Sequence, residues 1–141
     1  MKKLIYIASL LLVSSSIFSQ SNSIVGTWLT ADKKAHVEIY KSKDLYYGKL
    51  VWLKQPNDPK TGKPKLDKEN PNAEKRSRTI TDMVFLYNFK KNGEEYTEGY
   101  VYDCRSGKVY TGKLWLEGNS KLSMRGYAGI FFSTETWTRI N

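Results

Sequence analysis

The sequence MVFLYNFKKNGEEYTEGYVYD, residues 83–103, contains two segments rich in aromatic side chains on either side of the turn-forming stretch 91–94. Alternating side chains flanking a short turn are typical of a β-hairpin. The same pattern recurs along the chain and predicts eight strands, at residues 24–29, 35–40, 45–53, 83–90, 95–103, 108–116, 121–127 and 130–139.

Most connections between these segments are short, which favours antiparallel neighbours in sequential order. Eight strands in an open sheet would leave two unpaired edges, and closing the sheet removes both. The pattern therefore predicts an all-β fold, a single eight-stranded antiparallel up-and-down barrel with one long proline-rich loop.

That loop spans residues 54–78 and contains all four prolines of the chain: Pro56, Pro59, Pro64 and Pro71. It carries eight Lys or Arg residues against four Asp or Glu. Loops of this length in compact domains are usually either functional lids or disordered excursions. We expect a lid over one mouth of the barrel, and the alternative is a solvated excursion without a role.

The N-terminus has the features of an export signal. Lys2 and Lys3 precede an apolar run from Leu4 to Val13, and Ser19 supplies the small residue that a signal peptidase needs. We expect a signal peptide over residues 1–19 and one barrel domain over residues 20–141, in a periplasmic or secreted protein. The apolar run is too short to span a bilayer, and an uncleaved anchor is the alternative.

Charge and reactive side chains limit the classes of function. The 141-residue chain has 23 Lys or Arg and 14 Asp or Glu, so residues 20–141 carry a net charge of +7, which favours anionic partners. Export removes nucleic acid as the usual partner of such a basic domain. His36 alternates with apolar Ala35 and Val37 and should face outward. The lone Cys104 is expected to be a buried apolar residue, and the alternative is a reactive thiol or an intermolecular crosslink.

Candidate acids give no catalytic pair. Glu98 and Asp103 lie five residues apart on one predicted strand, which places them on opposite faces. We therefore expect no catalytic residues, no metal site and no cofactor, and predict that the protein is not an enzyme.

The motifs Gly26-Thr27-Trp28, Gly48-Lys49-Leu50-Val51-Trp52 and Arg125-Gly126-Tyr127 occur in an order that resembles the bacterial family called domain of unknown function 2147. The resemblance covers nearly all of the chain after the signal and implies an exported, lipocalin-like (calycin) barrel. Cys104 and Asp82 depart from the Pro and Gly expected of the family. The resemblance also implies that Arg139 covers Trp28 of the Gly26-x-Trp28 motif and closes the barrel, a structural role.

Two functions fit these observations. The first is a binding protein for a small apolar molecule or anionic amphiphile, with Arg78 at the mouth and Arg125 as an anion anchor if a bulge at Gly126 turns it inward. Its predicted lining residues are Trp52, Phe85, Tyr100 and Tyr110. The alternative is an envelope interaction module with a filled barrel that binds a protein, polysaccharide or anionic surface. A hollow interior would favour the first function.

Overall fold

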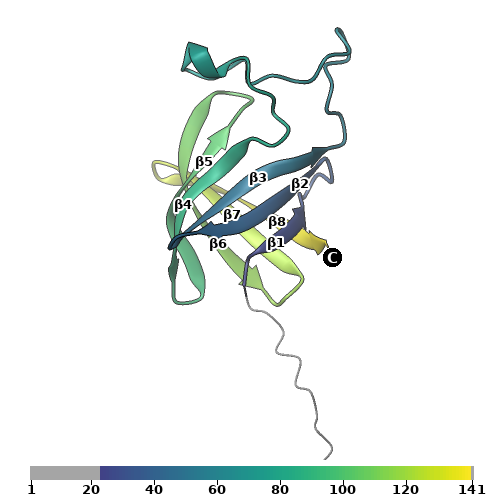
Figure 1. Cartoon of the computed structure of the whole chain (residues 1–141). Helices are drawn as coiled ribbons and strands as arrows, with labels where there is room; N and C mark the ends of the chain where they lie inside the picture. The colour runs from purple at the N-terminus through teal and green to yellow at the C-terminus, as the bar shows by residue number, and fades with distance from the viewer. Residues whose placement is uncertain (1–22, 141) are drawn as a thin grey trace, which may run out of the picture.

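The computed structural model describes residues 23–140, so the predicted signal peptide lies outside the described residues. The chain forms a closed barrel in which each strand pairs with its neighbours in sequence (Figure 1). Its strands are β1 (Gly26–Leu29), β2 (Ala35–Ser42), β3 (Leu45–Leu53), β4 (Val84–Asn92), β5 (Glu95–Asp103), β6 (Lys108–Glu117), β7 (Lys121–Ala128) and β8 (Phe131–Ile140). The all-β, antiparallel up-and-down barrel expected from the sequence is confirmed.

The barrel closes where β1 pairs with β8, with Trp28 opposite Arg139. This pairing leaves neither terminal strand with a free edge. Because the strands run up and down, the connections gather at two ends. The open end comprises the connections 30–34, 54–83, 104–107 and 129–130, and the closed end comprises 43–44, 93–94 and 118–120.

The hydrophobic core fills the barrel toward its closed end. Burying large apolar side chains is the main source of stability in a chain without a disulfide. The largest apolar side chains with almost no exposure are Trp28, Trp137, Phe89, Ile24, Ile39, Leu86, Leu114 and Leu122. On β2, Ala35 and Val37 are buried, whereas His36 lies outside with its ring 4.3 Å from that of Trp52, as the alternation predicted.

Two bulges change which residues face inward on β4 and β5. Asn88 and Glu98 have φ angles of 62° and 58°, a left-handed conformation unusual for residues other than glycine. The ladder between β5 and β6 shifts between Tyr96 and Gly99. Tyr96 is therefore buried, whereas Tyr100 is 40% exposed, although simple alternation placed both on one face.

The bulge on β4 has the same consequence. Met83 and Phe89 are buried, but Tyr87 stacks on Tyr100 at the outer surface, with ring centroids 5.3 Å apart. Regular alternation would place Met83, Phe85, Tyr87 and Phe89 on one face, and Tyr87 departs from it. In the β3–β4 ladder, β4 has one extra residue between Val84 and Leu86 and another between Leu86 and Phe89, and each reverses the facing of the residues beyond it.

Gly99 is required by the packing at the β5 bulge. A Cβ atom at this position would collide with the ring of Phe89. We expect Gly99→Ala to lower the free energy of unfolding by about 2 kcal/mol through overpacking, measured by urea denaturation. Gly126→Ala is the matched control, because its Cβ would have a nearest contact at 4.0 Å, from Tyr110. Equal stabilities for the two variants would contradict this account of the bulge.

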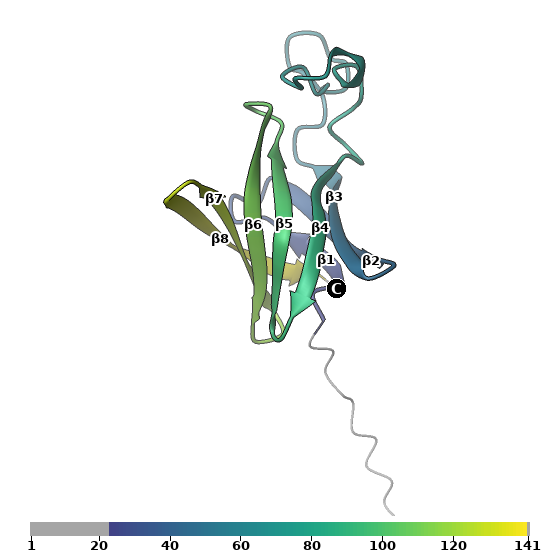
Figure 2. The same ribbon diagram turned by 90° about the vertical axis from the view of Figure 1, so that its left-hand side faces the viewer.

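The long connection between β3 and β4 is ordered around two short bridges. Asn57 pairs with Pro64, and Leu66 pairs with Thr79. A single 3-10 turn, η1 (Ala73–Lys75), begins after Asn72, whose side chain caps it by accepting a hydrogen bond from the Glu74 amide. The connection rises from the open end of the barrel (Figure 2). No helix within residues 23–140 is long and apolar enough to cross a membrane.

Candidate functional site

The open end of the barrel leads into a cavity of about 880 Å³. Its wall is built from residues of β2 to β8, above the packed closed end. Trp137 forms part of its boundary and is itself 1% exposed, so the cavity ends where the core begins. The main apolar lining residues are Leu50, Met83, Phe85, Tyr110, Met124 and Trp137.

Basic side chains line the mouth of this cavity. Lys34 and Lys54 are brought together by a backbone hydrogen bond, in which Lys54 N donates to Lys34 O at 2.8 Å. Lys65 reaches the same cavity from the long connection. Within the described chain, none of these three lysines forms an ion pair with a carboxylate. We call Lys34, Lys54 and Lys65 the mouth lysines.

The acidic groups of the cavity already have donors. Burial alone would raise the pKa of Asp103. The hydrogen bonds and the charge of Arg105, whose Nε lies 3.0 Å from Asp103 Oδ1, outweigh burial and lower this pKa. The Thr30 hydroxyl donates to Asp32 at 2.7 Å and lowers the pKa of that carboxyl. Glu135 accepts a hydrogen bond of 3.2 Å from the indole of Trp137. The mouth lysines are therefore the cations most available to an anionic group.

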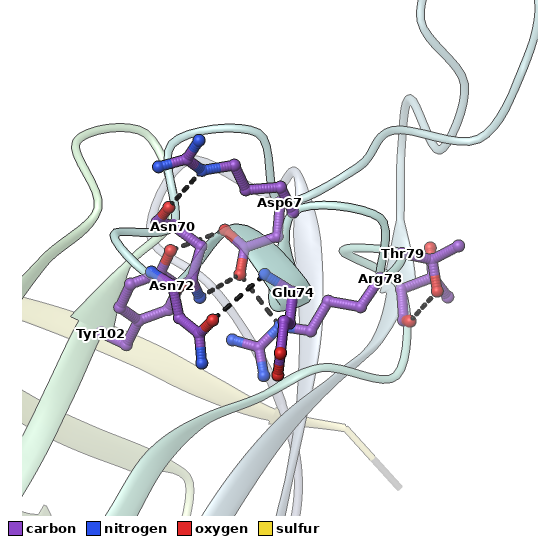
Figure 3. Close-up of polar contacts among 9 residues, drawn as sticks. Asp67, Asn70, Asn72, Glu74, Arg78, Thr79 and Tyr102 are labelled. Atoms are coloured by element: carbon purple, nitrogen blue, oxygen red, sulfur yellow. Dashed lines mark hydrogen bonds and ion pairs between the residues drawn. The ribbon is translucent and has the colours of Figure 1, made fainter.

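A buried carboxylate fastens the long connection to the barrel (Figure 3). Asp67 has no exposed surface, and its Oδ1 accepts a 2.6 Å hydrogen bond from the hydroxyl of Tyr102 on β5. Its Oδ2 accepts from Asn70 Nδ2 at 2.8 Å and from Arg78 Nε at 2.9 Å. Three donors from different parts of the chain thus compensate for burying the charge.

These contacts determine the ionisation states of Asp67 and Tyr102. Burial alone would raise the pKa of Asp67, but the hydrogen bonds from Tyr102, Asn70 and Arg78 outweigh it, and the pKa is lowered. Burial, together with the adjacent Asp67 carboxylate, raises the pKa of Tyr102 to about 12. Asp67 is consequently ionised and Tyr102 neutral at neutral pH, which suits the hydrogen bond between them.

The Asp67 anchor holds one part of the connection against the cavity. Lys65 and Ile80, joined by a 2.9 Å backbone hydrogen bond, both line it. On the other side, Gly107 packs so closely on Glu69 that a Cβ would overlap the Glu69 carbonyl oxygen. The connection is therefore part of the cavity wall and is fixed at two points on the barrel.

Of the four aromatic residues predicted to line a ligand site, the structure brings two together. Phe85 and Tyr110 line the cavity. Trp52 and Tyr100, however, are 41% and 40% exposed on the outer surface, where they contact His36 and Tyr87. Their predicted place inside the barrel is wrong, because bulges on the paired strands displace the alternation.

Neither predicted anion-binding arginine lines the cavity. Arg78 is held by Asp67, with its guanidinium carbon 5.7 Å from the centre of the Tyr102 ring. Arg125 lies on the outer face, where its Nε donates to Thr134 Oγ1 at 2.8 Å and its guanidinium carbon lies 4.3 Å from the centre of the Phe132 ring. The ladder pairs Gly126 regularly with Ser133, so no bulge turns Arg125 inward.

The residues assigned to barrel closure meet at the closed end. The guanidinium carbon of Arg139 lies 4.3 Å from the centre of the Trp28 ring. Its nitrogens donate to the backbone oxygens of Asn119 at 2.7 Å, Ser23 at 2.8 Å and Val25 at 3.1 Å. Arg139 therefore ties the chain before β1 to the turn between β6 and β7.

Comparison with protein families identifies the chain. Residues 26–139 match the model of DUF2147, described as uncharacterized proteins conserved in bacteria. The chain belongs to this family. A solved structure with a TM-score of 0.71 is similar over 84% of each chain at 27% sequence identity. It is described as protein HP1028 from the human pathogen Helicobacter pylori, which belongs to the lipocalin family. Comparison with curated proteins gives no match.

Sequence reasoning missed the mouth lysines and Asp67. The predicted topology could have indicated the mouth lysines. In an up-and-down barrel, the ends of odd-numbered strands and the starts of even-numbered strands meet at one end. Lys34 precedes β2 and Lys54 follows β3, so this DUF2147 protein places them together. Asp67 had no such signal, because its partner Tyr102 lies 35 residues away.

Proposed function

We propose that this protein is an exported, non-enzymatic carrier that binds one anionic amphiphile in the cavity at the open end of the barrel. The observation that carries the proposal is the cavity of about 880 Å³, with an apolar wall and the mouth lysines at its rim. Sites for small molecules are mostly apolar, and a few polar groups orient the ligand.

The distribution of polarity indicates how such a molecule would be oriented. Its apolar part would contact Phe85, Tyr110 and Met124 in the depth of the cavity, where removal from water is favourable. Its anionic group would lie beside the mouth lysines, which have no competing ion pair within residues 23–140. Burying the charge is avoided because the mouth stays in contact with water.

The alternative of an envelope module depends on a filled barrel. Core side chains such as Phe89 and Leu114 fill the closed half, but the open half encloses the cavity. The hollow half supports the carrier, and no separate observation favours the filled module.

A cavity-filling variant tests the proposal. Gly126 lines the cavity, and a Cβ atom at this position would have its nearest contact at 4.0 Å. With dansylaminoundecanoate as an anionic amphiphilic probe, we expect Gly126→Phe to weaken binding by about tenfold or more in a fluorescence titration, because its ring occupies the site of the apolar chain. Thr111→Phe adds a similar ring at an exposed position of β6 and should bind as the unmodified protein does.

Circular dichroism and urea denaturation would first show that both phenylalanine variants are folded. Equal affinity of Gly126→Phe and the unmodified protein would contradict the proposed site. Native mass spectrometry of the protein purified from an exported fraction then identifies the natural ligand as a non-covalent mass addition. Recovery of the unprocessed chain only from the cytoplasm would contradict export.

A further inference from the structure

The tip of the β7–β8 hairpin is exposed and entirely apolar. Ile130, Phe131 and Phe132 are consecutive in sequence and are 89%, 75% and 60% exposed. The turn is made by Gly129, whose φ of 62° suits glycine. Scattered single apolar residues are normal on protein surfaces, but three large ones on one projecting tip indicate a contact site.

This tip stands at the mouth of the cavity. Phe131 and Phe132 both belong to the cavity lining, together with the mouth lysines. Figure 2 shows the β7–β8 hairpin and the long connection rising from different sides of the open end. Apolar and basic groups therefore share one end of the molecule, around the opening through which a ligand must pass.

The positive charge of the protein is concentrated at the same end. The four connections of the open end contain eleven Lys or Arg residues against six Asp or Glu, a net charge of +5. Residues 20–141 as a whole carry +7, so the rest of the domain contributes only +2. An exposed apolar tip at the same end of the barrel as this positive charge is complementary to a bilayer that contains anionic phospholipids.

We propose that the open end docks on an anionic phospholipid bilayer, with Ile130 and Phe131 inserted at the boundary between headgroups and acyl chains. The lysines of the open end then lie at the level of the phosphates. This orientation turns the cavity mouth toward the membrane. The docking depends on the tip and the charge, so it does not require that the cavity hold a ligand.

The first test separates the tip from the rest of the surface. The full protein after signal removal is sedimented with vesicles of equal parts phosphatidylcholine and phosphatidylglycerol. We expect Ile130→Ser to weaken vesicle binding by about tenfold, because one large apolar side chain no longer inserts. Val25→Ser is the matched control, since Val25 is 42% exposed near the closed end, and it should bind as the unmodified protein does.

The second test addresses charge. Binding to vesicles of phosphatidylcholine alone should be weaker, and added salt should reduce binding to the anionic vesicles. Lys54→Glu, at the mouth, should bind anionic vesicles less well than Lys91→Glu, which makes the same change in net charge near the closed end. Equal losses for these two variants would overturn the proposed orientation.

The outcomes also distinguish this inference from the carrier function. Ile130 is not among the cavity-lining residues, so Ile130→Ser should bind the soluble dansyl probe with unchanged affinity. If the protein binds the dansyl probe but not the vesicles, the docking proposal is wrong and the carrier proposal stands. If it binds the vesicles but not the probe, the carrier proposal is wrong and the docking proposal stands. The protein could instead form a dimer that the Ile130→Ser substitution dissociates. If it does so and the unmodified protein binds no vesicles, the tip is a contact between two copies and the docking proposal is wrong.

Discussion

Replacing Arg139 by alanine is expected to lower the free energy of unfolding by about 3 kcal/mol. Its guanidinium lies over the indole of Trp28 at 4.3 Å and donates to three backbone oxygens from two separate segments of the chain. Charge-assisted hydrogen bonds and a partly buried cation–π contact contribute about 1 to 3 kcal/mol each, and they are not additive. Urea denaturation followed by tryptophan fluorescence measures the loss.

Two substitutions control this prediction. Arg139→Lys keeps the charge but loses the planar array of donors, so it should recover only part of the stability. Arg125→Ala also removes a guanidinium from an aromatic ring, at Phe132, but on the exposed outer face, where we expect less than about 1 kcal/mol. Similar losses at Arg139 and Arg125 would contradict a special role for Arg139 in closing the barrel.

Replacing Asp67 by alanine is expected to release the long connection from the barrel. The change leaves the hydroxyl of Tyr102, the amide of Asn70 and part of Arg78 without their acceptor. A loss of about 3 kcal/mol in local stability corresponds to about 100-fold faster hydrogen exchange at Ile80, whose amide donates to Lys65. Amides in the β5–β6 ladder should exchange as before.

The comparison with Asp58→Ala isolates the effect of burial. Asp58 lies in the same connection and pairs with the exposed Lys68 at 3.5 Å, so its removal should leave the exchange of Ile80 unchanged. Unchanged exchange in Asp67→Ala would show that the connection is held by other contacts.

The anchor also predicts a pH dependence with a definite sign. The pKa of Asp67 is lowered in the folded protein below its ordinary value of 3.8, so the native state favours the ionised form. Its contribution is fully present above that value and is lost as the pH falls below it, through the folded pKa. Protection of Ile80 should decline in this acidic range in the unmodified protein and should show a weaker decline in Asp67→Asn.

The pattern of apolar residues was sufficient to predict the inward face only where the strands are regular. On β2 the alternation correctly assigned Val37 inside and His36 outside. On β5 it failed, because Glu98 adopts a left-handed conformation and displaces the register between Tyr96 and Tyr100. Glutamate rarely marks such a bulge, so nothing local in the sequence distinguished this strand from a regular one.

The amino-acid sequence by itself determined the strand order and the antiparallel barrel, since short connections and periodic side chains are local properties. The contact of Arg139 with Trp28 was implied by the resemblance to the family, and the structure contains it. Only the tertiary structure decided that the closed half is packed and the open half hollow. It also brought together Asp67 with Tyr102 and gathered the mouth lysines. These features depend on volumes and contacts between strands distant in sequence, which no local pattern encodes.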